Sequence, residues 1–571
     1  MTPIPVGPER VAMADEHLRR ESPNLSNGNR NSPPLPWWAA ASLAGIAFGV
    51  VLFAMSMSKH LDHDEHQFVA PGALLARAGL LPYRDYPYFH VPYLLFLYAA
   101  LDRVTSHLLL AARVTSVAGG TAILMSLFAV AYRAFARLGR RAAWAAGLVA
   151  GGALLTNPVF TATSGRAWNH DLPTLLLLLA TFALWRGTER GRRGWLAAAG
   201  VLLGLAAGTR LTFAPVWLAF AVASYRGLGR GRRGAGGVLL MTAGCAAALL
   251  PLIAVAAAAP RAFLFGNFTY PALNTTFRRI NGYPRAMTAG GKVAYAFKDL
   301  LIYPGNLMLF AACAASFVGL WHEGRRRRRM AGAAPAEPHP NRERVRSLAW
   351  VIGTLLVGSF APTPLFTPYF FAPLPFAVLV VVLVAADERK TAAQSAGWRA
   401  ALLVAAAVAI VRGLGALQHL ELLGRPRHWT PMRVHAAGRA VARRVGGGGR
   451  RVLTFAPIVP LEGGCVIYPE FATGPFASRV ADFVAEADER AFKEVDEDDL
   501  PALLAERPPA GVLVGVEGRQ DAPLEAYART HGMTPHRIAR GDVLGPMRAW
   551  ALPRHAATGP ALAGRRSARG R

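Results

Sequence analysis

The sequence predicts a polytopic α-helical membrane protein with a small C-terminal α/β domain outside the membrane. Of the 571 residues, 53% are hydrophobic and only 17% are charged, whereas soluble domains carry about a quarter charged residues. Several apolar runs approach the roughly 20 residues that a membrane-spanning helix needs. Short clusters of arginine separate these runs, which is typical of the cytoplasmic loops of membrane proteins.

The net charge of +29 does not indicate a nucleic-acid-binding protein. Only five of the 63 basic residues are lysines, and many of the arginines lie at the ends of apolar runs rather than along one basic face. The three cysteines, Cys245, Cys313 and Cys465, stand singly in different segments. They therefore form neither a disulfide framework nor a cysteine-based zinc site. We expect no nucleic-acid partner.

The chain begins with a polar segment, residues 1–35, which we expect to be a disordered cytoplasmic tail. Trp37 to Ser58 is an uncharged run of 22 residues without a small-residue cleavage site close behind it. It is therefore predicted to be a membrane anchor and not a cleaved signal peptide.

A transmembrane domain is predicted over residues 36–416, with about eleven helices and the N-terminus in the cytoplasm. This orientation places the arginine clusters, such as the five at 325–329, inside the cell. The helices are expected near 37–58, 108–135, 142–161, 172–186, 195–209, 211–225, 235–259, 300–321, 347–361, 368–386 and 398–416. Three substantial segments then lie outside: 59–107, 260–299 and 417–571.

The C-terminal segment, 417–571, differs from the rest in composition. Short β-like runs at 451–457, 511–516 and 547–553 alternate with an acidic stretch and with a helix-like run at 499–508. Strands that alternate with helices predict a small α/β domain. We expect it to be extracytoplasmic.

The external segment 59–107 carries the strongest local signal. Asp62, Asp64 and Glu65 lie within four residues of one another, among three histidines. Clustered carboxylates at a membrane boundary need a cation, a hydrogen-bonding partner or a catalytic role, although a solvated loop with incidental acids is the plain alternative. An amphipathic helix on the membrane surface is expected at 66–79, and the tyrosines at 83, 86 and 88 suit an interfacial aromatic belt.

This segment resembles the first external loop of the GT-C glycosyltransferases, and most closely the protein O-mannosyltransferase and aminoarabinose-transferase type. The resemblance rests on the Asp64-Glu65 pair, on "ARAGLLPYRDY" at 76–86 and on "HVPYLLFL" at 90–97. Family members often have His-Pro-Pro or Lys-Pro-Pro where this chain has His90-Val91-Pro92. The resemblance implies catalytic roles for Asp64 and Glu65, and substrate-binding roles for Arg84, Asp85 and His90.

A second acidic position stands at the outer end of the fourth predicted helix, in Asn169-His170-Asp171. The resemblance implies that Asp171 is catalytic and faces the carboxylates of the first loop, with His170 in substrate binding. A helix cap is the alternative reading of the same residues. No cofactor is certain, and a divalent cation held by Asp64, His170 and Asp171 stays open.

Arginines and one tyrosine complete the expected substrate site. Arg210 follows a small-residue helix, Arg278 and Arg279 lie in the external segment 260–299, and Tyr369 lies in an aromatic-proline turn at 367–379. The planar fork of arginine suits phosphate. Snorkelling is the alternative for Arg210, and solvation is the alternative for the loop arginines.

The function expected from the resemblance is an inverting transferase of the bacterial inner membrane. It would move a sugar from a polyprenyl-phosphate donor to a lipid, glycan or protein acceptor outside the cytoplasm. A lipid or sugar transporter or flippase is the main alternative, because many spans and intramembrane charges suit it. A catalytically inactive scaffold is the other. Acids concentrated on the outer face, without an inverted repeat, favour the transferase.

Overall fold

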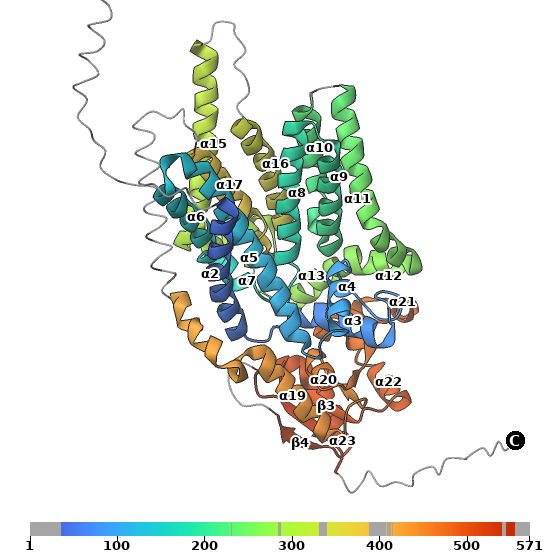
Figure 1. Ribbon diagram of the computed structural model, residues 1–571. Helices are drawn as coiled ribbons and strands as arrows, with labels where there is room; N and C mark the ends of the chain where they lie inside the picture. The colour runs from blue at the N-terminus through green and yellow to red at the C-terminus, as the bar shows by residue number, and fades with distance from the viewer. Residues whose placement is uncertain are drawn as a thin grey trace, which may run out of the picture. The chain divides into compact units, whose positions relative to one another are not determined.

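The structure is a computed structural model that describes residues 36–229, 231–283, 287–330, 340–386, 415–538 and 544–553, with 407, 411 and 413. Over these residues the chain is mostly helical and ends in a mixed β-sheet (Figure 1). The predicted tail 1–35 and most of the predicted span 398–416 lie outside the described residues.

Ten long helices correspond to the first ten predicted spans. They are α2 (Trp37–Ser58), α5 (Leu108–Phe135), α6 (Arg140–Leu155), α8 (Asp171–Arg190), α9 (Arg193–Thr209), α10 (Val216–Gly227), α11 (Arg232–Ala258), α15 (Pro304–Met330), α16 (Pro340–Phe360) and α17 (Pro373–Ala385). Among the described residues, five segments are long and apolar enough to cross a membrane: Trp37–Ser58, Leu108–Leu138, Arg232–Ala258, Pro304–Arg325 and Thr367–Ala385. The chain is thus a helical multi-pass membrane protein, and the number of eleven spans stays a prediction.

Small residues allow the long helices to approach one another closely. In Figure 1, α8, α9 and α11 lie side by side. Gly200 of α9 faces the backbone of α11 so closely that a Cβ atom there would lie 1.9 Å from the carbonyl oxygen of Met241. Such contacts are typical of helix pairs in membranes, where close van der Waals packing replaces the hydrophobic effect.

The external segment 59–107 forms two short helices, α3 (His63–Ala78) and α4 (Tyr93–Asp102). A capping box begins α3, because the Asp62 side chain accepts from the backbone and Glu65 reaches back to the Asp62 N–H. The predicted helix is present, but its placement on the membrane surface is wrong. Every residue from Glu65 to Leu74 is buried, because α4, α5 and the C-terminal helix α20 (Ile458–Glu462) pack against it.

The three tyrosines of this segment form a buried core and not an interfacial belt. The side chains of Tyr83, Tyr86 and Tyr88 are almost completely buried, and their rings meet edge to face at centroid distances of 5.6 and 6.5 Å. The sequence interpretation was wrong here because the packing partners come from distant segments, among them Phe263.

The predicted strands of the C-terminal segment form part of a five-stranded sheet with the order β2-β1-β3-β5-β4. Strands β1 (Arg451–Leu453), β2 (Val466–Ile467) and β3 (Gly511–Val514) are parallel, while β4 (Thr534–Arg537) and β5 (Arg548–Ala551) pair antiparallel. Helices α19 (Thr430–Arg444), α21 (Glu486–Phe492), α22 (Leu500–Glu506) and α23 (Ala522–Thr530) accompany the sheet. The helix-like run at 499–508 is α22.

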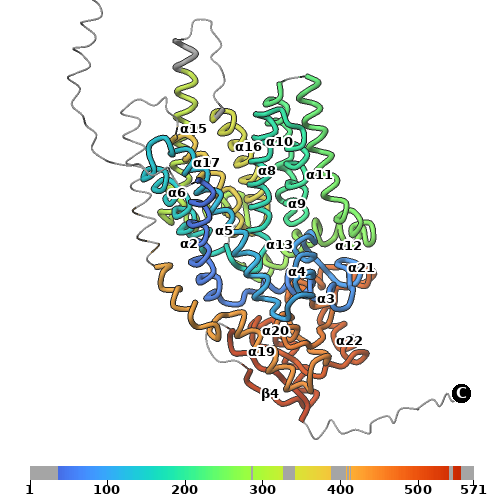
Figure 2. The backbone as a smooth tube through the Cα atoms, in the orientation of Figure 1, coloured from blue at the N-terminus to red at the C-terminus, as the bar shows by residue number. Residues whose placement is uncertain are grey.

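The three segments that the sequence places outside the membrane pack on one another. One hydrophobic cluster joins Phe68 of α3 to Ala262 and Val434, and another joins Phe89 to Tyr270 and Phe476. Arg77 of α3 donates to the carbonyl oxygen of Leu461 at 2.8 Å. The backbone trace in Figure 2 shows the orange and red C-terminal segment beside the blue α3 and α4. The candidate site lies where these segments meet.

Candidate functional site

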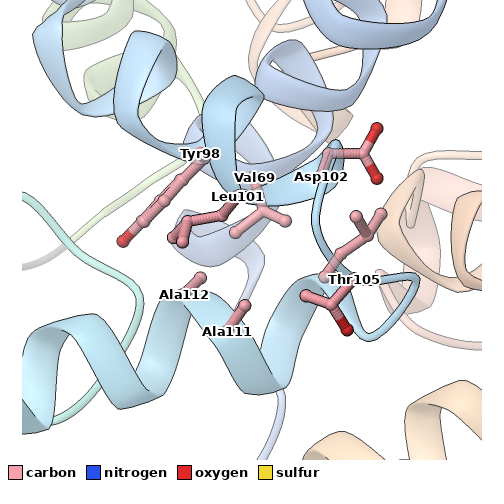
Figure 3. Close-up of a pocket in the computed structure, with 8 residues that line it drawn as sticks. Val69, Tyr98, Leu101, Asp102, Thr105, Ala111 and Ala112 are labelled. Carbon is pink, nitrogen blue, oxygen red and sulfur yellow. The ribbon is translucent and has the colours of Figure 1, made fainter.

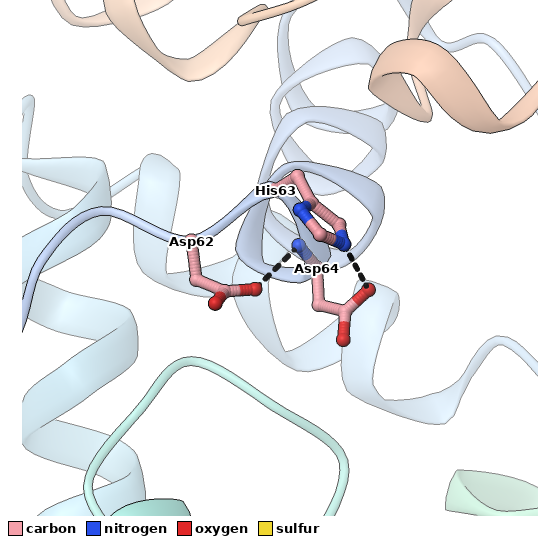
Figure 4. A group of neighbouring side chains, drawn as sticks. All are labelled: Asp62, His63 and Asp64. Carbon is pink, nitrogen blue, oxygen red and sulfur yellow. Dashed lines mark hydrogen bonds and ion pairs between the residues drawn. The ribbon is translucent and has the colours of Figure 1, made fainter. Parts of the chain in front are cut away.

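Asp64 occupies the first turn of α3, directly after the loop that leaves α2. Its backbone N–H donates to Asp62 at 2.9 Å, and its carboxylate lies 3.6 Å from the imidazole of His63 (Figure 4). The side chain keeps 40% of its surface exposed. Burial of the remainder raises the pKa of Asp64 above its ordinary value of 3.8. Asp64 is therefore a partly open carboxylate that holds its proton more tightly than a solvated one.

A chain of hydrogen bonds connects Asp64 to His90. Gln67, one turn further along α3, donates its amide to Asp64 at 3.1 Å, and its carbonyl oxygen accepts from Nε2 of His90 at 2.8 Å. His90 also lies against the ring of Phe68, and burial lowers the pKa of its imidazole to about 3. His90 is thus neutral and positioned by Gln67, a residue that the sequence analysis missed because no motif contains it.

Arg210 and Tyr369 interact electrostatically with Asp64, and His170 interacts with Arg210. The guanidinium of Arg210 lies over the ring of Tyr369 at 5.7 Å and donates to Thr212 and Asn169. Its charge acts on His90, His170 and Asp64. His170 is buried between Trp168 and Phe371, with neither ring nitrogen hydrogen-bonded. The structure therefore brings Arg210 and Tyr369, two residues expected in substrate binding, to the carboxylate of the first loop, and His170 is joined to them through Arg210.

The two adjacent arginines of the external helix α13 (Tyr270–Ile280) face different surroundings. Arg278 is half-buried over the rings of Tyr283 and Phe366, at 4.9 and 5.3 Å, and its charge acts on Asp64. Arg279 is exposed. Neighbouring positions on a helix point in different directions, so the structure separates Arg278, which joins the group, from Arg279, which does not.

Glu65 does not share the open surroundings of its neighbour Asp64. Its two oxygens accept four hydrogen bonds, two from Arg113, one from Ala167 N and one from Asp62 N, at 2.7–3.1 Å. Arg113 in turn directs all five of its N–H groups to Glu65 and to three backbone carbonyls at the end of α2. Burial would raise the pKa of Glu65, but the charge and hydrogen bonds of Arg113 lower it to about 2. The expected catalytic role is corrected: Glu65 is a structural anion with no free lone pair.

Asp171 is likewise buried and occupied. It accepts from the Ser164 hydroxyl at 2.5 Å and from Gly165 N at 2.9 Å. Among the described residues, no contact joins it to Asp64. The catalytic role expected for Asp171 stays a prediction. The helix cap is not what the structure shows, because His170 is the N-cap residue of α8 and has no side-chain cap hydrogen bond. Asp171 instead holds Ser164 and Gly165 of the preceding loop against the start of α8.

The Arg84–Asp85 pair is also separate from the group of residues around Asp64. They pair with each other at 2.7 Å, and Asp85 also accepts from Leu81 N at 2.7 Å. Arg84 is half exposed, and Tyr83 beside it has a positive φ of 66°. The pair closes a tight turn, and the substrate-binding role expected for Arg84 and Asp85 stays a prediction.

The described residues grouped closely enough to hold a cation differ from the expected set of Asp64, His170 and Asp171. In the described part of the chain, Asp62, His63 and Asp64 are the acidic and imidazole groups whose ligand atoms all lie within 4.8 Å of one another. His170 and Asp171 are not among them. Two carboxylates and an imidazole suit a divalent cation, so these three residues would hold one.

The enclosed hollow between α3, α4 and α5 is not a substrate site. Its volume of about 10 Å³ is lined by Val69, Tyr98, Leu101, Asp102, Thr105, Leu108, Ala111 and Ala112 (Figure 3). A space of this size accepts about one water molecule. The sugar and lipid of a glycosyl donor require far more room.

Comparisons with solved structures identify the fold. ArnT from Cupriavidus metallidurans bound to undecaprenyl phosphate matches with a TM-score of 0.52 and 17% identity, over 89% of this chain and 97% of ArnT. Its apo state matches with a TM-score of 0.52 and 16% identity, over 90% and 98%. The apo oligosaccharyltransferase of Archaeoglobus fulgidus gives a TM-score of 0.43 at 12% identity, over 84% and 70%.

No protein-family model and no curated protein sequence matches this chain. ArnT is a GT-C membrane glycosyltransferase, and the likeness extends over nearly the full length of both chains. At this level of identity the likeness establishes the fold. The resemblance predicted from the first external loop is thereby confirmed: the chain has the fold of the GT-C membrane glycosyltransferases.

Proposed function

We propose that the protein is an inverting membrane glycosyltransferase that takes a sugar from a polyprenyl-phosphate donor. The acceptor is a lipid, glycan or protein on the extracytoplasmic side of the bacterial inner membrane. The fold supports this proposal, since the ArnT structure with the same fold contains undecaprenyl phosphate. A lipid-linked donor also explains why the polar site is built on helices that enter a membrane.

The observation that carries the proposal is the contrast among the acids of the site. Among the described residues, one oxygen of Asp64 accepts no hydrogen bond and its side chain is partly exposed. Glu65 accepts four hydrogen bonds, and the buried Asp171 accepts one on each oxygen. The charges of Arg210 and Arg278 both act on Asp64. A carboxylate between cationic groups suits a reaction in which a proton is removed while a phosphate gains charge.

The reaction that fits this arrangement is a single displacement. The acceptor hydroxyl attacks the anomeric carbon and its proton passes to Asp64. The bond from the anomeric carbon to the phosphate oxygen breaks, and its electron pair remains on the phosphate. Arg278 and Arg210 stabilise that negative charge as it develops. The raised pKa of Asp64 makes it a stronger base than a solvated aspartate.

The test is product formation by the purified protein in lipid vesicles. With radiolabelled polyprenyl-phosphate sugar and an envelope extract as acceptor source, we expect label in a product whose anomeric configuration is opposite to that of the donor. Asp64→Asn should lower this rate by about 10²–10⁴-fold, the usual contribution of a general base. Asp488→Asn, in an exposed ion pair with Arg261, is the matched control and should transfer at the wild-type rate.

Three outcomes would contradict the proposal or part of it. Retention of configuration would replace a single displacement by a different mechanism. Passage of intact donor lipid across the vesicle membrane, without a new glycosidic bond, would favour the flippase. Full activity of Asp64→Asn would remove Asp64 from the chemistry.

A further inference from the structure

The C-terminal segment places a buried arginine, Arg479, beside the Asp64 group. Arg479 follows β2 and stacks its guanidinium on the ring of Phe476 at 4.3 Å. Phe476 contacts the imidazole of His63 at a centroid distance of 5.5 Å. Its carbonyl oxygen accepts from the Tyr270 hydroxyl at 2.9 Å. His63 and Tyr270, from the external segments, thus hold Phe476 in position, and the guanidinium of Arg479 stacks on the ring of Phe476.

The guanidinium of Arg479 lacks the partners that a buried charge requires. Only 8% of the residue is exposed, yet neither Nε nor one of the terminal nitrogens makes a hydrogen bond. In the described part of the chain Arg479 forms no ion pair within 4.0 Å. An unsatisfied buried cation is costly, and Arg113 shows how fully this protein satisfies an arginine whose role is structural.

A second arginine with the same deficiency lies nearby. Arg278 has a buried Nε without a hydrogen-bond partner, and its charge acts on Arg479. The nearby negative groups are Asp64 and Glu517, and neither lies within ion-pair distance of Arg479. Burial raises the pKa of Glu517 to about 7, which weakens it as a counter-charge at neutral pH. Two adjacent cations with free N–H groups suit an anion with several oxygens.

The topology of the sheet explains why this arginine faces the site. The loops after the parallel strands β1, β2 and β3 leave the same edge of the sheet, which is where α/β folds bind ligands. Gly474, in the β2 loop, approaches both the loop after β1 and the external helix α3, since a Cβ there would lie 3.0 Å from Phe455 O and 3.5 Å from His66. Glu517 lies in the β3 loop, which Asp521 holds by accepting from three backbone N–H groups.

We propose that Arg479 and Arg278 together bind a phosphate group of a substrate, so that the C-terminal segment supplies part of the active site. The inference rests on the proposed function, and it adds a residue from outside the transmembrane domain. The phosphate belongs either to the polyprenyl donor or to the acceptor. Both sources present the oxygen-rich anion that two arginine forks recognise.

The experiment measures phosphate binding separately from sugar transfer. Full-length protein in detergent is titrated with polyprenyl phosphate, with polyprenol and with glycerol 1-phosphate, while tryptophan fluorescence is recorded. Arg479→Gln should weaken phosphate binding by about 10–100-fold, the loss of a charge-assisted hydrogen bond. Arg479→Lys should lose less, because lysine keeps the charge without the fork. Arg490→Gln, an exposed arginine of α21, is the control and should bind like the wild type.

The three titrated compounds identify which substrate supplies the phosphate. A loss for polyprenyl phosphate but not for polyprenol assigns Arg479 to the donor, whereas a loss for glycerol 1-phosphate alone assigns it to the acceptor. Unchanged affinity of both phosphates in Arg479→Gln and Arg479→Lys overturns the inference, as does the absence of saturable phosphate binding by the wild type. Arginine-dependent binding without sugar transfer would instead overturn the proposed function alone.

Discussion

Asp64 and Glu65 are adjacent in the sequence, yet they belong to two regions with opposite physical properties. The Glu65–Arg113 pair is fully hydrogen-bonded: the carboxylate accepts four hydrogen bonds, and Arg113 donates five. Around Asp64 the groups are incompletely satisfied, and Arg278, Arg479 and His170 all keep buried polar atoms without partners. The comparison teaches that the Glu65–Arg113 pair is satisfied within the protein, whereas the groups around Asp64 keep polar atoms that a ligand can satisfy.

The largest expected effect on stability is at the saturated region. Glu65→Gln leaves the charge of Arg113 buried and uncompensated, which costs about 3–5 kcal/mol. Thermal unfolding of the detergent-solubilised protein measures this loss. Glu343→Gln, in an exposed pair with Arg346, is the control and should change stability by no more than about 1 kcal/mol. Equal melting temperatures for the two variants would contradict the structural role of the Glu65–Arg113 pair.

The variant Asp171→Asn tests whether the acid at the start of α8 stabilises the fold, as Glu65 does, and takes no part in the reaction. In Asp171→Asn, the amide replaces one oxygen that accepts from Ser164 or Gly165, so we expect a loss of about 1–3 kcal/mol. Transfer per folded molecule should stay within about threefold of the wild type, which corresponds to less than 1 kcal/mol of barrier. A folded variant that has lost transfer would return Asp171 to the reaction.

The two acids should respond to pH in different ranges. The pKa of Glu65 is lowered from 4.5 to about 2, so its contribution to stability is complete above pH 4.5 and disappears as the pH falls towards 2. The pKa of Asp64 is raised above 3.8, and the base must be ionised, so transfer should decline at a pH where the fold is intact. Rate and melting temperature measured on the same samples would show this separation, and coincident curves would contradict it.

The smallest effect is expected at the exposed turn. Arg84→Gln removes the charge that faces Asp85, but Asp85 keeps its hydrogen bond to Leu81 N. We expect the KM for the donor and the melting temperature to match those of the wild type. An increase in the donor KM of tenfold or more would restore the substrate-binding role that the sequence resemblance implies for Arg84.

The sequence predicted the long helices well because apolar composition and length determine them locally. The runs 37–58 and 108–135 coincide with α2 and α5. The polar strand β4 and the two-residue strand β2 were missed, since neither has an apolar alternation that marks a strand. Register and pairing, which create such strands, come from the rest of the sheet.

The site was predictable only in part, because spacing along the chain does not reveal which charges are satisfied. Asp64, Arg210, Arg278 and Tyr369 interact electrostatically in the structure, while their catalytic and binding roles stay predictions. Arg113 gave no signal, since composition does not single out one of two arginines in a mostly apolar helix of 28 residues. Arg479 lies in an irregular loop without a motif. The opposite roles of Asp64 and Glu65 depend on contacts 48 and more residues away.

The most direct measurement is an experimental structure of the Asp64→Asn variant with a polyprenyl-phosphate sugar bound. We expect the anomeric carbon beside the side chain at position 64 and the phosphate between Arg278 and Arg479, with Glu65 and Arg113 unchanged behind them. A donor bound against Asp171, or one whose anomeric carbon lies outside the reach of position 64, would contradict the assignment of Asp64 as the base.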